Sequence, residues 1–118
     1  MTWRCGTALV CGLMLAAGLG IAATAVQAAE FGCGSRGSLR SQNSDLLVRI
    51  TFYNGSRAFR ALEWIDFSGN FTGYGGMNPG ESKTINTYVT HPWMITDGPG
   101  NCKYIYTSSG RAGTVVLH

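Results

Sequence analysis

Short runs rich in β-branched and aromatic residues, separated by turn residues, fill the chain from residue 46 to its end. Seven such runs lie at residues 46–53, 59–67, 71–74, 83–89, 93–96, 102–107 and 114–117. Turn sequences such as Asn54-Gly55-Ser56 stand between them, and no long window in this part of the chain has helical periodicity. The pattern predicts an all-β fold, a small antiparallel β-sandwich of about seven or eight strands.

The run at residues 83–89 alternates as a strand does, with Ile85, Thr87 and Val89 on one side and Thr84, Asn86 and Tyr88 on the other. Pro92 follows it. A proline restricts the residue before it to an extended conformation and lacks an amide hydrogen for a sheet ladder. We therefore expect a strand break or a sheet edge at this point.

The first 28 residues have the three parts of a secretory signal peptide. Arg4 supplies a positive start, and an uncharged apolar run of 16 residues follows at positions 8–23. That run is shorter than the roughly 20 residues that a membrane-spanning helix needs. Val26-Gln27-Ala28 then provides a small-residue cleavage site, so we expect cleavage before Ala29. The alternative is an uncleaved N-terminal anchor.

Cleavage would leave one domain, residues 29–118, that is secreted or periplasmic and not stably inserted in a membrane. Residues 29–44 are rich in Gly and Ser, and we expect them to form an extended lead-in segment. Two of the four cysteines leave with the signal, and Cys33 and Cys102 remain. In an oxidising compartment these two are expected to form a disulfide, with a pair of free thiols as the alternative.

The sequence offers little support for catalysis, metal binding or nucleic-acid binding. His91 is the one internal histidine, and the other, His118, is the last residue. No nucleophile elbow, paired carboxylates or metal-ligand spacing accompanies them. The formal net charge of +3 comes from scattered residues. We therefore expect no enzyme activity, no cofactor, no metal and no nucleic acid. Two glycosylation sequons, at Asn54 and Asn70, fall in expected turns and should be accessible.

Residues suited to molecular recognition are concentrated within thirty positions of the expected strands. They are Trp64, Tyr74, Thr87, Tyr88, His91 and Trp93. One interpretation is that the aromatic members are simply the core of a small sandwich. The other interpretation is that these residues line a binding site. Exposure of Trp93 would separate the two interpretations, since a fully buried tryptophan belongs to the core.

Several segments of residues 39–102 resemble the von Hippel–Lindau (VHL) β-domain family, in particular its stand-alone, exported bacterial members. They include Ile50-Thr51-Phe52-Tyr53-Asn54-Gly55-Ser56, Trp64-Ile65-Asp66-Phe67-Ser68-Gly69 and Thr87-Tyr88-Val89-Thr90-His91-Pro92-Trp93. The resemblance implies that the six recognition residues form a ligand-binding pocket for hydroxyproline in an extended peptide. Thr87 replaces a serine of the family, Asn86 a histidine and Pro92 a leucine.

In this family a helical domain binds the ubiquitin-ligase adaptor, and no such sequence follows before His118. We therefore expect no role in ubiquitin ligation. The expected function is an exported binding module for extended peptide that contains hydroxyproline or proline. We expect the peptide to lie along the edge formed by residues 83–93, where main-chain pairing would give affinity. The alternatives are a structural or interaction domain of the cell envelope, and a carbohydrate-binding module.

Overall fold

The computed structural model describes residues 28–108 and 110–118, so the expected signal peptide lies outside the described residues except for Ala28. Eight strands and one short 3-10 helix occur in this part of the chain. They are β2 (Ala28–Phe31), η3 (Cys33–Ser35), β3 (Leu47–Asn54), β4 (Arg60–Ile65), β5 (Phe71–Met77), β6 (Ser82–Tyr88), β7 (Pro92–Thr96), β8 (Cys102–Ser108) and β9 (Gly113–Leu117). No helix in the described ranges is long and apolar enough to span a membrane.

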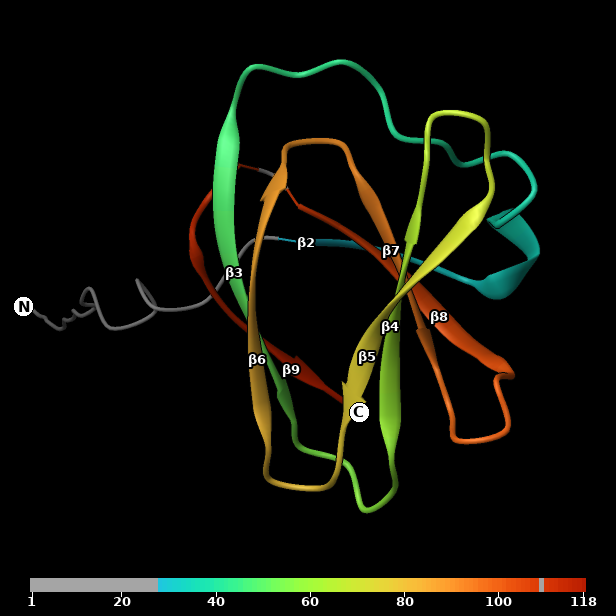
Figure 1. Ribbon diagram of the computed structural model, residues 1–118, viewed down its shortest axis with the longest axis vertical. Helices are drawn as coiled ribbons and strands as arrows, with labels where there is room; N and C mark the ends of the chain where they lie inside the picture. The colour runs from blue at the N-terminus through green and yellow to red at the C-terminus, as the bar shows by residue number, and fades with distance from the viewer. Residues whose placement is uncertain (1–27, 109) are drawn as a thin grey trace, which may run out of the picture.

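The strands form two sheets that pack face to face, and Figure 1 shows them at the two sides of the molecule. One sheet has five strands in the order β2-β8-β7-β4-β5, and the other has three in the order β6-β3-β9. The paired strands are antiparallel except β3 and β9, which run parallel. The predicted all-β sandwich is confirmed, with this one parallel pair added.

The seven strands expected from the sequence all form, with ends that differ by up to three residues. β2 was not expected, because its sequence Ala-Ala-Glu-Phe carries no strand pattern and is extended through pairing with β8. The expected strand break at Pro92 is confirmed, since β7 begins there. The alternative of a sheet edge is wrong, because β7 lies between β8 and β4. A proline fits inside a sheet at the first residue of a strand, where its missing amide hydrogen matters least.

The main core lies between the two sheets. Phe52 and Ile50 of β3 face Leu62, Trp93 and Ile95 of the five-stranded sheet, and all five are buried. The ring of Phe52 contacts that of Trp93, with centroids 6.1 Å apart. This burial is the main stabilising contribution, at about 25 cal/mol for each Å² of apolar surface removed from water.

A second, smaller cluster covers the other face of the five-stranded sheet. Ile65, Met94 and Ile105 are buried there against Leu39 of the lead-in segment. Every residue of β7 is buried as a result. The lead-in segment is therefore a packed layer of the domain, which fixes its position relative to β4 and β7.

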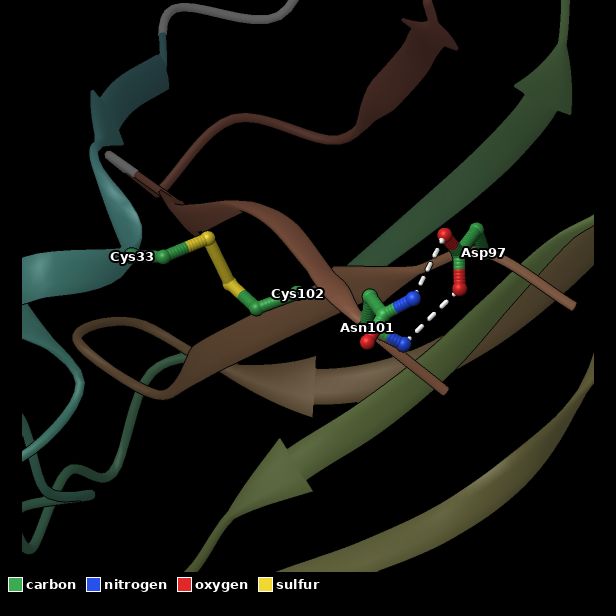
Figure 2. Close-up of a disulfide and its surroundings, with 4 residues drawn as sticks. All are labelled: Cys33, Asp97, Asn101 and Cys102. Carbon is green, nitrogen blue, oxygen red and sulfur yellow. Dashed lines mark hydrogen bonds between the residues drawn. A yellow bond between two sulfur atoms is a disulfide. The ribbon is translucent and has the colours of Figure 1, made fainter. Parts of the chain in front are cut away.

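The disulfide predicted between Cys33 and Cys102 is present and joins η3 to the start of β8 (Figure 2). It links residues 69 positions apart, and closing a loop of that length stabilises a fold by roughly 4 kcal/mol in the chain-entropy model. Figure 2 also shows the adjoining turn, where the carboxylate of Asp97 accepts hydrogen bonds from the backbone and side-chain amides of Asn101. The bond from the Asn101 backbone is the largest cause that lowers the pKa of Asp97. The disulfide and this turn together fix the beginning of β8.

One of the two sequons is not accessible, contrary to the expectation. Asn54 is the last residue of β3 and is fully buried. Its amide nitrogen donates to the carbonyl oxygens of Ala58 and Met77, at 2.8 and 2.9 Å. Asn70 is exposed in the turn before β5. The turn signal at Asn54 thus reflects a side chain that ties the turn together from inside the fold.

Candidate peptide-binding pocket

The six recognition residues predicted from the sequence line one pocket of about 290 Å³. The pocket lies where β6 and β5, the edge strands of the two sheets, approach each other. Its lining residues come from β4, β5, β6, β7, the β6–β7 turn, the loop after β4 and the lead-in segment: Trp64, Tyr74, Thr87, Tyr88, His91, Trp93, Asn43, Ser44, Phe67 and Asn86. The fold thus brings together side chains that are spread over fifty positions of the chain.

Four of these residues were not predicted as pocket residues. Asn43, Ser44 and Phe67 lie within segments that resemble the VHL family, so a signal for them was present. Asn86 was recognised only as a departure from the family. Phe67 lies two residues after the end of β4, in a range that the sequence pattern predicted as strand. Its position in the loop at the mouth of the pocket was therefore not predicted.

Aromatic rings form the walls of the pocket. The ring of Phe67 meets those of Trp64 and His91 edge to face, at centroid distances of 5.9 and 5.4 Å. Tyr74 stands edge-on to Trp93 at 4.9 Å, and Tyr88 lies 5.4 Å from His91. Phe67, Tyr74 and Tyr88 are 51%, 42% and 40% exposed. These rings offer accessible apolar surface, while their mutual contacts hold them in place.

Exposure of Trp93 was expected if the recognition residues form a pocket, and burial if they form only the core. Trp93 is 2% exposed and belongs to the main core. Thr87 and His91 are also nearly buried, at 3% and 6%. Because all three still line the pocket, the small exposed parts of their side chains lie at its inner end. The core interpretation is therefore correct for most of Trp93, and the accessible apolar surface belongs to the outer rings.

The hydrogen bonds at the inner end define which groups remain for a ligand. The indole nitrogen of Trp93 donates to the hydroxyl oxygen of Thr87 at 3.0 Å, so the Thr87 hydroxyl keeps its hydrogen for donation. The Nε2 atom of His91 lies 3.2 Å from the carbonyl oxygen of Gln42. A carbonyl oxygen only accepts, so Nε2 carries the hydrogen and Nδ1 of the neutral ring is an acceptor. At the inner end of the pocket, Thr87 therefore supplies a hydroxyl donor and His91 a ring acceptor.

His91 is held in its neutral form by its surroundings. Burial among the aromatic rings lowers the pKa of His91 below its usual value of 6.5, and the bond to the Gln42 carbonyl offsets part of this effect. A charged imidazolium would lose solvation in this setting. His91 therefore remains a neutral acceptor at and above neutral pH.

The turn that carries His91 adopts an unfavourable backbone conformation. Thr90 has a positive φ of 78°, which a β-branched residue rarely adopts. The turn is closed by a hydrogen bond of 3.2 Å from the His91 amide to the Tyr88 carbonyl oxygen. Through this turn the edge strand β6 connects to the central strand β7 of the other sheet, with Tyr88 and His91 on the same pocket.

Comparison with protein families identifies the fold. The family model of the VHL beta domain matches residues 39–104, more than half of the chain. The chain belongs to the VHL β-domain family. A comparison with curated proteins found none that matches it.

The matched region of this VHL β domain contains every residue that lines the pocket, as well as Cys102. Cys33 lies ahead of it, so the disulfide ties the matched region to the preceding segment. VHL β domains are modules for the recognition of proteins and peptides, not a catalytic family. In the described ranges no group of three or more His, Cys, Asp and Glu side chains could hold a metal ion.

Proposed function

We propose that this VHL β domain is an exported module that binds extended peptide, with a hydroxyproline or proline ring in the pocket. The observation that carries the proposal is the combination at the inner end of the pocket. A hydroxyl donor on Thr87 and a neutral ring acceptor on His91 lie among aromatic walls. A pyrrolidine ring is a rigid apolar body that packs on Trp and Tyr and has little conformational entropy to lose.

The 4-hydroxyl of hydroxyproline matches these two polar groups. It can accept a hydrogen bond from Thr87 and donate one to Nδ1 of His91, which leaves neither unpaired. A plain proline would bury the same two groups without partners. Such a loss costs roughly 1–3 kcal/mol, which corresponds to a preference of roughly 5- to 150-fold for the hydroxylated peptide.

The main chain of the peptide would extend along β6. This strand is an edge of the three-stranded sheet and contributes Asn86, Thr87 and Tyr88 to the pocket. An extended peptide can add to such an edge as a further strand. The expected edge of residues 83–93 is thereby narrowed to Ser82–Tyr88, because β7 is a central strand.

Calorimetry with matched hydroxyproline and proline peptides tests the ligand. The disulfide-bonded protein should prefer the hydroxyproline peptide, and Thr87→Ala and His91→Ala should each remove the preference. Thr51→Ala is the matched control, because the Thr51 hydroxyl bonds Thr84 outside the pocket. Equal weak heats for both peptides in all four proteins would refute the proposal.

Export is the second part of the proposal. It is supported by the Cys33–Cys102 disulfide, since disulfides persist in oxidising compartments. The measurement is the mass of the protein recovered from the producing cells. A mature form beginning at Ala29 supports export, and a full-length chain with Cys33 and Cys102 reduced contradicts it.

A further inference from the structure

The lead-in segment forms one side of the candidate pocket as well as a layer of the domain. Asn43 and Ser44 line the pocket, and the Gln42 carbonyl bonds the ring of His91. Figure 1 shows this part of the chain crossing the end of the sandwich on its way from η3 to β3, near the β4–β5 loop and the β6–β7 turn. The backbone conformation of the lead-in segment at Gln42 therefore determines which backbone group bonds the His91 ring.

Two neighbouring residues fasten this part of the lead-in to β4 and the loop that follows it. Ser41 is 3% exposed, its hydroxyl donates to the Ile65 carbonyl oxygen at 2.5 Å, and its amide donates to that of Asp66 at 3.1 Å. The Arg40 guanidinium donates to the Ser68 carbonyl oxygen. A buried hydroxyl with a backbone partner holds a segment firmly, because losing the bond leaves the buried carbonyl unpaired.

Ser41 is the chain neighbour of Gln42, whose carbonyl oxygen is the partner of His91 Nε2. Because this carbonyl only accepts, its position places the ring hydrogen on Nε2 and leaves Nδ1 as the acceptor. If the segment moved, the ring would gain solvent and lose the bond that selects this tautomer.

We propose that Ser41 is a positioning residue of the pocket, which holds the Gln42 carbonyl against His91 and so keeps His91 Nδ1 an acceptor. Ser41 does not line the pocket and acts through the lead-in segment. Its effect on affinity rests on the proposed hydroxyproline ligand, whereas its effect on His91 does not.

NMR of protein labelled with ¹⁵N in its histidines tests the positioning role directly, because His91 and His118 are the two histidines of the chain. In the unaltered protein His91 should be the Nε2–H tautomer with a pKa below its ordinary value. In Ser41→Ala the tautomer should become mixed and the pKa of His91 should rise, because burial, which lowers this pKa, outweighs the Gln42 bond, which raises it. The ring ¹⁵N signals of His118, which stacks on Tyr104 at a centroid distance of 4.2 Å, should be the same in both proteins.

Ser38→Ala is the matched control, since the Ser38 hydroxyl is exposed and donates to the Ser35 carbonyl oxygen within the lead-in segment. Affinity for a hydroxyproline peptide should fall at least fivefold in Ser41→Ala and should be unchanged in Ser38→Ala. If Ser41→Ala does not fold, Arg40→Ala is used instead, because Arg40 is exposed and its guanidinium also holds the lead-in segment. Its loss should change the tautomer and the pKa of His91 in the same direction.

An unchanged tautomer and pKa of His91 in a folded Ser41→Ala or Arg40→Ala protein would overturn the proposal. A changed His91 in a protein that binds neither peptide would support the positioning role and refute the proposed ligand. The two ideas therefore fail separately.

Discussion

Replacing Thr87 by valine should destabilise the domain itself, apart from any effect on a ligand. Thr87 and Trp93 are 3% and 2% exposed, and the indole hydrogen donates to the threonine hydroxyl at 3.0 Å. Valine keeps the shape of the side chain but leaves the indole N–H buried without an acceptor. The expected cost is about 1–3 kcal/mol, a substantial part of the 5–15 kcal/mol by which a typical domain is stable. The melting temperature of a domain of this size should fall by about 4–8 °C for each kcal/mol.

Urea unfolding of the unaltered protein and of Thr87→Val measures this loss of unfolding free energy. Thr51→Val is the control, because it removes a hydroxyl that bonds Thr84 at the surface, at 2.8 Å, and its cost should stay below about 0.5 kcal/mol. Adding Trp93→Phe to Thr87→Val removes both partners of the buried bond, so the second change should cost less than Trp93→Phe costs alone. The reasoning is refuted if Thr87→Val is as stable as Thr51→Val.

Three further changes follow from the structure. The pKa of His91 is lowered from 6.5 in the folded protein, so the unfolded chain binds more protons as this residue titrates. Stability should therefore decrease as the pH falls from about 7 to about 5. In His91→Gln the urea midpoint should depend less steeply on pH over this range, and an unchanged dependence would contradict the lowered pKa. Thr90→Gly should raise the unfolding free energy by roughly 0.5–1 kcal/mol, because glycine adopts the positive φ of 78° without strain and loses only part of the gain to chain entropy; a lower urea midpoint would show that Thr90 is not strained. Asn54→Ala should cost roughly 1–3 kcal/mol, because it removes the partner of the buried Met77 carbonyl group. Asn70→Ala, at the exposed sequon, should leave the melting temperature nearly unchanged, and equal effects of the two changes would contradict the burial of Asn54.

Local pattern was sufficient to predict most of the strands and the alternation of β6. Thr87 and Tyr88 were predicted on opposite faces, and the structure has Thr87 buried and Tyr88 exposed. β2 could not be predicted in this way, because its conformation depends on pairing with the distant strand β8. The central position of β7 was missed for a similar reason. A proline at the first residue of a strand has the same sequence signal whether that strand is central or at an edge.

Six of the pocket residues were predicted from the sequence, but which of them are buried and which are exposed was not. Sequence pattern cannot show that Trp93 lies almost entirely in the core while Phe67 is half exposed at the mouth, since both are aromatic residues next to strand ends. The role of Gln42 could not be predicted either, because its carbonyl is a backbone group that any residue would supply. Backbone partners of this kind depend on the path of the chain in three dimensions.

The topology of the two sheets has a consequence for the order in which the chain folds. Ala28 of β2 pairs with Ser108, and Ile50 pairs with Gly113, so each sheet includes a strand that is synthesised late. Contacts between such distant residues require the closure of long loops before any contact is gained, which places folding in the range of about milliseconds to seconds. Until β8 is available, the sheet that covers Phe52 lacks Tyr106, whose ring lies edge to face with that of Phe52 at a centroid distance of 5.6 Å. Neither sheet can therefore be completed before β8 and β9 have left the ribosome.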